Sequence, residues 1–247
     1  MPIVIAGTTA ATNASTINRA LATAAEERGY GFGLGSQRAM ARTPESAWTY
    51  KVRDVAPNAL LFGNVGVVQA RDMSTADVQG LVDEVKADAL CVHMNPAMEI
   101  VQPEGDRDFR GGLDTFRRLW SELNVPVVAK ETGNGIARAT AKALRNAGIR
   151  YADTSGAGGT SWVGVETMRE RCGRGSWRRT LGIGVYRRRS FDDACVRPTT
   201  IAMRHQIGAR RCARDRARCE RRGDCATRVS GIFGWWRRGT ARVFRST

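Results

Sequence analysis

The sequence predicts an α/β protein of the (β/α)8 TIM-type barrel class, represented by six recognisable β/α units within residues 1–170. Two observations predict this class. Short apolar segments alternate with amphipathic segments at a spacing of roughly 25–30 residues, which is typical of a parallel sheet covered by helices. Unusual polar residues also follow the apolar segments at the same end, where barrel proteins gather their functional groups.

Six apolar segments are the predicted strands: 2–7, 29–36, 59–66, 88–95, 126–132 and 149–156. Between them, the spacing of apolar residues predicts helices over 13–29, 74–87, 113–124 and 137–148. The first helix has Asn13 as its N-cap, Gly29 at its end and Ile17 on its apolar face. In the second, Ser74 and Asp77 form a capping pair, and four residues share one apolar face: Val78, Leu81, Val82 and Val85.

The composition of the chain changes after about residue 170. Residues 1–170 hold 18 Lys and Arg against 19 Asp and Glu, whereas residues 171–247 hold 21 against 5. All 21 basic residues of this second segment are arginine, and it also holds five of the six cysteines. The net charge of +15 therefore belongs to the tail, 171–247, and the two segments are interpreted as a partial barrel domain and an aberrant tail.

Three interpretations of the tail stay open. Out-of-frame translation of a G+C-rich gene would yield arginine without lysine, together with scattered Cys and Trp, and is the favoured hypothesis. An arginine-rich arm that binds nucleic acid is the second interpretation, although such arms usually mix Lys with Arg. A zinc module is disfavoured, because the tail cysteines include no C-x-x-C pair.

Membrane and secretory classes are disfavoured by the sequence. No apolar run approaches the roughly 20 residues that span a bilayer. The first residues, MPIVIAGTTAATNAS, have no basic segment before their short apolar stretch, so they are a poor signal peptide. The expected location is the cytoplasm.

Polar residues follow all six predicted strands. Taken singly, each has an ordinary structural explanation, such as a turn, a solvated strand end or a satisfied core histidine. Their shared placement favours a functional edge, because surface polarity has no reason to recur at one end of six strands. The residues, strand by strand, are Thr8 and Thr9; Ser36, Gln37 and Arg38; Asn64; His93, Asn95 and Glu99; Lys130 and Glu131; and 155–160. Cys91 lies within a strand and is expected in the core.

Five motifs resemble those of type 2 isopentenyl-diphosphate isomerases over about residues 3–170. They are GSQR (35–38), FGNVG (62–66), HMNPAMEIVQPEGDRDF (93–109), PVVAKETGNG (126–135) and DTSGAGGTSW (153–162). The resemblance implies a barrel that interconverts isopentenyl and dimethylallyl diphosphate with FMN and Mg²⁺, while NADPH serves as the reductant. It also implies a small-molecule diphosphate substrate and a homo-oligomer, often a tetramer, with no membrane.

The same resemblance implies roles for individual residues. The FMN contacts would be Gly7, Thr8, Thr9, Ser36, Asn64, Lys130, Ser155 and Thr160. The substrate contacts would be Ser36, Gln37, Arg38, His93, Asn95 and Met98. Glu99 would bind Mg²⁺, and Glu166 would assist proton transfer as the catalytic residue. Glu104 and Asp106 are expected to shape the loop after Glu99.

The sequence departs from the family pattern in four places. The N-terminal basic stretch is absent, GTTAA replaces G-M-T-G-G after the first strand, and Met98 stands where many members have glutamine. A thioether cannot orient a proton as an amide can. After about residue 170, nothing matches the seventh and eighth strands, whose loops commonly hold the phosphate of a barrel ligand. We therefore expect this polypeptide to bind FMN poorly and to turn over little substrate.

Two other functions remain as alternatives. The first is a basic nucleic-acid-binding protein that acts through the arginine-rich tail, with the barrel as scaffold. The second is another FMN-dependent barrel oxidoreductase, such as an α-hydroxy-acid oxidase. That chemistry needs a histidine near the seventh strand, and His205 sits in unpatterned sequence.

Overall fold

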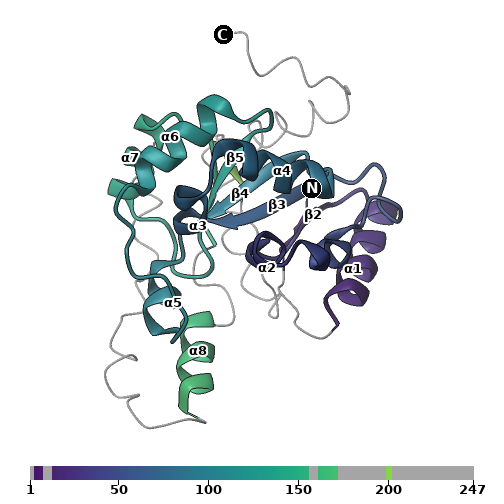
Figure 1. Cartoon of the computed structure of the whole chain (residues 1–247), viewed down its shortest axis with the longest axis horizontal. Helices are drawn as coiled ribbons and strands as arrows, with labels where there is room; N and C mark the ends of the chain where they lie inside the picture. Colours follow the sequence, from purple (N-terminus) through teal and green to yellow (C-terminus); the bar gives the residue numbers. More distant parts are fainter. Residues whose placement is uncertain (1–2, 8–12, 156–160, 172–198, 202–247) are drawn as a thin grey trace, which may run out of the picture.

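The structure, a computed structural model, describes residues 3–7, 13–155, 161–171 and 199–201. In these residues a single parallel sheet has its strands in the order of the sequence (Figure 1). The strands are β1 Val4–Ile5, β2 Gly31–Gly33, β3 Leu61–Gly66, β4 Ala89–His93, β5 Val127–Lys130, β6 Tyr151–Asp153 and β7 Thr199–Ile201. A doubly wound sheet would reverse its strand order at a switch point, so the uninterrupted order is that of a barrel. The predicted fold class, an incomplete (β/α) barrel, is confirmed.

The seventh strand corrects one expectation. The tail was predicted to contribute no strand to the barrel, yet Thr199–Ile201 pairs in parallel with β6, with Asp153 opposite Ile201. Three residues are too few to show a period-2 pattern, which is why the sequence did not reveal this strand. Its two threonines and one isoleucine are nevertheless residues that favour strands. The other predictions on the tail concern residues outside those that the structure describes.

The four helices predicted from periodicity are present. They are α1 Ala14–Arg28, α4 Thr75–Val85, α6 Gly112–Glu122 and α7 Arg138–Asn146. Five further helices were not predicted: α2 Arg38–Arg42, the 3-10 helix η1 Pro44–Tyr50, α3 Val67–Asp72, α5 Pro96–Val101 and α8 Trp162–Arg171. Four of these have five to seven residues, and so short a helix cannot show a repeated apolar face.

The helix ends follow local chemistry where the sequence signal is strong. Gly29 ends α1 in the left-handed conformation, and Ser74 and Asp77 form the predicted reciprocal capping box of α4. The four predicted apolar residues of α4 are all buried. In α1 the prediction is only partly right, because Asn13 makes no side-chain cap and Ile17 is 39% exposed.

The two faces of the sheet carry different side chains. One face contributes to the larger core, with helices α1, α3, α4 and α6 in contact with the strands. Its strand residues include Leu61, Val65, Leu90, Val92, Val127 and Ala129. The other face carries a smaller cluster of Ala6, Leu60, Phe62, Ala89, Cys91 and Val128. Since side chains alternate along a strand, Asn64, His93 and Lys130 point to the same side as this smaller cluster.

Cys91 is confirmed as a core residue. It is 2% exposed, and burial raises the pKa of its thiol to about 12. At neutral pH it is therefore a packed thiol and not a nucleophile.

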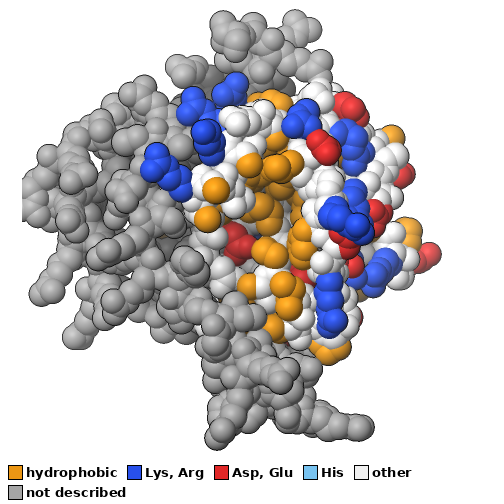
Figure 2. All heavy atoms as spheres, turned by 90° about the vertical axis from the view of Figure 1, so that its left-hand side faces the viewer, with side chains coloured by type: hydrophobic (Ala, Val, Ile, Leu, Met, Phe, Trp, Pro, Cys, Tyr) orange, Lys and Arg blue, Asp and Glu red, His pale blue; other side chains and the backbone are white. Residues whose placement is uncertain are grey.

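The surface of the described part mixes both charge signs around apolar side chains. In Figure 2 hydrophobic side chains form a band through the middle of the face, with Lys, Arg, Asp and Glu interspersed around it. The exposed large hydrophobic residues include Ile100 on α5, Leu113 on α6 and Val165 on α8. Among the described helices, none has the length and apolar character needed to cross a membrane.

Candidate functional site

Strand register brings the polar strand ends together. Gly66 pairs with His93, His93 pairs with Lys130, and Lys130 pairs with Asp153. These four residues are the last of their strands, so they form one row at the C-terminal edge of β3 to β6. The shared placement that the sequence indicated is confirmed for His93 and Lys130, whereas Gly66 and Asp153 were not predicted.

The ammonium group of Lys130 contacts three acceptors of this chain. Its Nζ is 2.5 Å from Asp153 Oδ2, 3.1 Å from the Glu131 carbonyl oxygen and 3.3 Å from Ser155 Oγ. The two charged side chains are 4% and 0% exposed. An ammonium group has three hydrogens to donate, and three acceptors of this chain surround it. The positive charge of Lys130 is therefore compensated within the protein.

Ser155 and Glu131 complete this strand-end cluster. Ser155 donates from its hydroxyl and its backbone N–H to Asp153 Oδ1, and it has a positive φ of 31°. Glu131 is 4% exposed, and its Oε2 accepts from the N–H groups of Thr132 and Asn134. Burial raises the pKa of Glu131, and these two N–H groups oppose that rise. The sequence placed Glu131 at a strand end, but it did not reveal that its carboxylate accepts hydrogen bonds from the backbone that follows.

His93 is held in one tautomer by Asn64. The amide nitrogen of Asn64 donates to the Leu34 carbonyl at 3.1 Å, so its Oδ1 is the acceptor that faces His93 Nδ1 at 2.9 Å. The proton of the neutral ring therefore lies on Nδ1, which leaves a lone pair on Nε2. Burial, together with the positive charges of Lys130 and Arg38, lowers the pKa of His93 to about 4. At neutral pH the ring is uncharged.

Gln37 and Arg38 follow β2 but differ in burial and in their hydrogen-bond partners. Gln37 is completely buried, its Nε2 donates to the Leu81 carbonyl at 2.8 Å, and its Oε1 accepts from the Asn64 N–H at 2.9 Å. This geometry favours a structural role and not the predicted substrate contact. Arg38 is 24% exposed and faces Asp106 at 3.5 Å, while its buried Nε has no hydrogen-bond partner within the described residues.

Gly7 has a structural explanation of its own, and Ser36 contributes a backbone contact. The Ser36 carbonyl accepts from the Tyr50 hydroxyl at 2.9 Å. A Cβ on Gly7 would lie 2.0 Å from the Leu34 carbonyl oxygen, so the close approach of two chain segments requires glycine there. Thr8, Thr9 and Thr160, three of the predicted cofactor contacts, lie outside the described residues.

The segment after β4 builds a turn that buries one carboxylate. Asn95 is 2% exposed, has a left-handed φ of 46° and accepts from the Thr132 hydroxyl through Oδ1. Pro96 then begins α5, on which Met98 is half-buried and Glu99 is 7% exposed. Asparagine tolerates the left-handed conformation better than most residues, which suits it to this position.

Glu99 faces the loop that follows its helix. Its Oε2 accepts from the Asp106 N–H at 2.9 Å, while Oε1 has no hydrogen bond within the described part of the chain. Burial raises the pKa of the Glu99 carboxyl; the Asp106 N–H and Arg38 oppose this rise, and the Asp106 carboxylate adds to it. The expectation that Asp106 shapes this loop is confirmed by its backbone contact.

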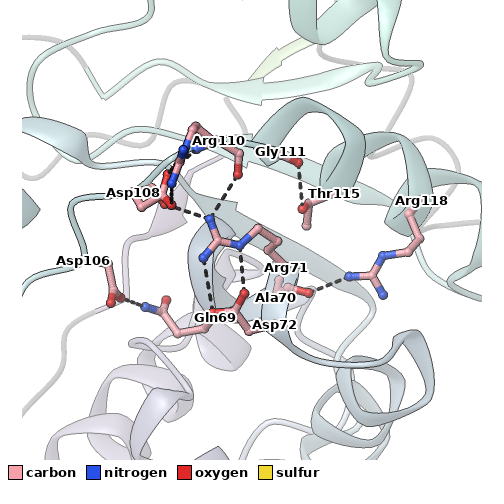
Figure 3. A network of polar contacts seen from close by, with 10 residues as sticks. All are labelled: Gln69, Ala70, Arg71, Asp72, Asp106, Asp108, Arg110, Gly111, Thr115 and Arg118. Carbon is pink, nitrogen blue, oxygen red and sulfur yellow. Dashed lines mark hydrogen bonds and ion pairs between the residues drawn. The ribbon is translucent and has the colours of Figure 1, made fainter.

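A second network fixes the loop against α3, and no sequence signal indicated it (Figure 3). Gln69 donates to Asp106 Oδ2, and Arg71 Nη1 donates to the carbonyls of Asp108 and Arg110 at 2.9 and 3.0 Å. Arg118 of α6 donates to the Ala70 carbonyl at 2.6 Å. The loop that orients Glu99 is thus tied to α3, and α3 is in turn tied to α6.

Glu166 lies on α8, which packs beside α5 (Figure 1). It is half-buried and follows Trp162 by four residues on the same helix. The structure therefore places the predicted proton-transfer residue next to the helix of Glu99, and not in the row of strand ends.

Among the described residues, no group of three or more His, Cys, Asp or Glu side chains could hold a metal ion. Mg²⁺ does not require such a group, since it is commonly held by one or two carboxylates together with substrate phosphates.

No protein-family model matches the chain. An isopentenyl-diphosphate delta-isomerase of Methanosarcina mazei is 47% identical over 167 residues, which is 67% of this chain and 46% of that protein. Those of Methanococcoides burtonii and Pyrococcus horikoshii are 50% and 45% identical, over 62% and 69% of this chain and 42% and 48% of those proteins. The matched part of this chain is related to isopentenyl-diphosphate delta-isomerases.

The resemblance over about residues 3–170 is thus confirmed. The chain spans about half the length of the isopentenyl-diphosphate delta-isomerases that it matches. Among solved structures, a mandelate racemase/muconate lactonizing protein of Paracoccus denitrificans has a TM-score of 0.38 at 15% identity, over 68% of this chain and 44% of that one. A likeness at this level supports no argument.

Proposed function

We propose that residues 3–170 form the diphosphate-binding part of a type 2, flavin-dependent isopentenyl-diphosphate isomerase. The observation that supports this proposal is the 45–50% identity to isopentenyl-diphosphate delta-isomerases over 62–69% of this chain. The reaction would add one proton to an alkene and remove another from an allylic carbon. Its substrate would be anchored by its diphosphate.

Arg38 is the strongest candidate for the residue that binds the diphosphate anion. Its buried Nε is a donor without a partner among the described residues, although Asp106 faces another nitrogen of the same guanidinium. A buried donor without an acceptor costs about 1–3 kcal/mol, and a phosphate oxygen would remove that cost. The planar guanidinium also suits the paired hydrogen bonds that phosphate accepts.

The residues present fit a magnesium ion that is shared with a diphosphate. Glu99 offers a carboxylate oxygen that accepts no hydrogen bond from the residues that the structure describes, and its other oxygen accepts from the Asp106 N–H. A hard oxygen ligand of this kind is what Mg²⁺ prefers. Glu99 would hold the ion, which would supply charge to bind the diphosphate. Glu166 remains the proposed proton-transfer residue.

Two of the described residues, Lys130 and Ser155, do not fit FMN as they are arranged. All three hydrogens of the Lys130 ammonium face acceptors of this chain, and Ser155 is bound to Asp153. A contact from Lys130 to a flavin would require one of these bonds to break. No step through FMN, or through NADPH as its reductant, is therefore assigned to this chain.

The test uses the full purified chain. With FMN supplied, we expect absorbance to show no stoichiometric flavin and an isomerase assay with Mg²⁺ and reductant to show little turnover. Calorimetry should nevertheless show Mg²⁺-dependent binding of isopentenyl diphosphate that is lost in Glu99→Gln, because the neutral amide is a poor ligand for the ion.

The two parts of this test fail separately. Stoichiometric yellow flavin with full activity would overturn the expectation about FMN. Absence of Mg²⁺-dependent diphosphate binding would overturn the proposed function itself. Glu122→Gln, on α6, is the matched control, because it changes the same charge at an exposed position whose contact is with Thr75.

A further inference from the structure

Buried polar atoms without a partner are concentrated beside the proposed diphosphate site. In the described residues they are Asn18 Oδ1, Arg38 Nε and Gln69 Oε1. The last two belong to side chains that both contact Asp106 Oδ2. Most buried polar groups in proteins are satisfied, so a missing partner for each of two neighbouring side chains needs a physical reason.

The unpartnered oxygen of Gln69 lies next to His93. Gln69 Nε2 donates to Asp106, as Figure 3 shows. The other terminal atom of the same amide, Oε1, therefore does not face Asp106. Gln69 Oε1 and His93 Nε2 lie 1.7 and 3.0 Å from the point where a Cβ on Gly66 would stand. Glycine at position 66 therefore leaves room for these two atoms to meet.

Two acceptors lie near this point. His93 Nε2 carries a lone pair, because Asn64 fixes the single ring proton on Nδ1. Gln69 Oε1 likewise carries only lone pairs, so neither atom can donate to the other. A second proton on the ring would give Nε2 a hydrogen and would satisfy Gln69 Oε1.

The charges around the ring decide when this proton can bind. Burial acts most strongly against a positive charge on His93, and the charges of Lys130 and Arg38 add to this effect. Lys130 is already paired with Asp153, whereas the Nε donor of Arg38 has no partner among the described residues. A polyanion bound at Arg38 would offset the charge that opposes protonation of the ring.

We propose that Gln69 is a positioning residue of the diphosphate site, whose carbonyl accepts the Nε2–H of a doubly protonated His93 that forms when the anion binds. The proton comes from solvent and goes to Nε2, and no covalent bond is made or broken. Through its amide nitrogen, Gln69 also holds Asp106, whose backbone N–H orients Glu99. The inference rests on the proposed function, because it takes a diphosphate as the anion.

The first test measures His93 without any ligand. The chain has only two histidines, so nitrogen NMR of the full chain can be assigned with a His205→Gln variant. We expect the Nδ1–H tautomer and a pKa well below 6.5. Gln69→Glu places a carboxylate beside Nε2 and should raise that pKa by at least about one unit.

Gln79→Glu is the matched control. Gln79 is also half-buried and also donates to an aspartate, Asp83, but it lies on α4, away from the row of strand ends. It should leave the His93 pKa nearly unchanged. If both variants shift His93 equally, or neither does, the contact between Gln69 and His93 is wrong.

The second test counts protons. Calorimetry of the full chain with Mg²⁺ and inorganic pyrophosphate, in buffers of different ionisation enthalpy, gives the protons taken up on binding. The difference between wild type and His93→Gln isolates the proton on His93, expected to be about one at pH 7. Gln69→Leu should lose at least about half of this difference, and Gln79→Leu should retain it.

Each outcome has a defined meaning. Retention of the full difference in Gln69→Leu overturns the positioning role. If wild type binds no pyrophosphate, the proposed function and the anion-linked protonation both fail. The NMR comparison then still decides whether Gln69 contacts His93.

Discussion

Two polar clusters lie at the same edge of the sheet and differ in how complete they are. Around Lys130, each hydrogen of the ammonium group has an acceptor, and the charge is matched by Asp153. Around Arg38 and Gln69, a buried donor and a buried acceptor have no partner in the described part of the chain. The first cluster is satisfied without a ligand, whereas the second leaves donors and acceptors for one.

This difference separates stability from function. A satisfied buried pair holds β5 and β6 together and is costly to break, because removing one partner leaves the other charged and desolvated. An unsatisfied cluster costs stability in the free protein and recovers it when a ligand supplies the missing partners. The following predictions, from the largest expected effect to the smallest, test whether the two clusters differ in this way.

Asp153→Ala should destabilise the protein by about 3–5 kcal/mol, because it leaves the Lys130 ammonium buried without a counter-charge. Urea unfolding followed by circular dichroism measures the effect. The double variant Lys130→Met, Asp153→Leu is the control, since it removes both charges and keeps similar volumes. It should recover much of the lost stability; equal losses in both variants would show that packing and not charge holds this cluster.

Stability should fall as pH drops from about 6.5 to about 4, because of His93. Burial lowers its folded-state pKa to about 4, so in this window the unfolded chain binds a proton that the folded chain does not. The loss is up to about 3 kcal/mol at the acid end of the window, and it should be absent above pH 7. Urea titrations of wild type and His93→Gln give this difference, and identical pH profiles would contradict it.

Gly7→Ala should destabilise more than Gly66→Ala. At Gly7 the new Cβ meets the Leu34 backbone oxygen at 2.0 Å, and a backbone atom cannot move away easily. At Gly66 it meets the end of the Gln69 side chain, which can rotate. We expect about 1–3 kcal/mol for Gly7→Ala and less for Gly66→Ala in urea unfolding. Gly66→Ala should instead displace Gln69 and alter the nitrogen shifts of His93; a reversed order of stabilities would refute this account.

Local signals explain which parts of the fold could be predicted. Gly29 and the Ser74–Asp77 capping box end and begin helices through contacts within a few residues, so the sequence shows them directly. The short helices α3 and α5 could not be predicted, because six residues cannot display a repeated face. β7 was missed for the same reason, since its three residues show no alternation.

The candidate site was predicted only in part. The ends of the six strands were located to within three residues, because alternation and strand length are visible in the sequence. The partners of each polar group were not, because Gln37 bonds to Leu81, Gln69 to Asp106 and Lys130 to Asp153 across long stretches of chain. Such pairs depend on how elements distant in sequence pack.

By itself, the sequence determined the class of fold, the order of the six strands and the edge at which His93, Lys130 and Glu99 lie. These follow from periodicity and strand ends, which are properties of neighbouring residues. Only the tertiary structure decided which polar groups are satisfied and which are left open, as it did for Lys130 and for Gln69. The physical reason is that a buried hydrogen bond depends on angstrom-scale distances between side chains from different elements, and no local pattern encodes those distances.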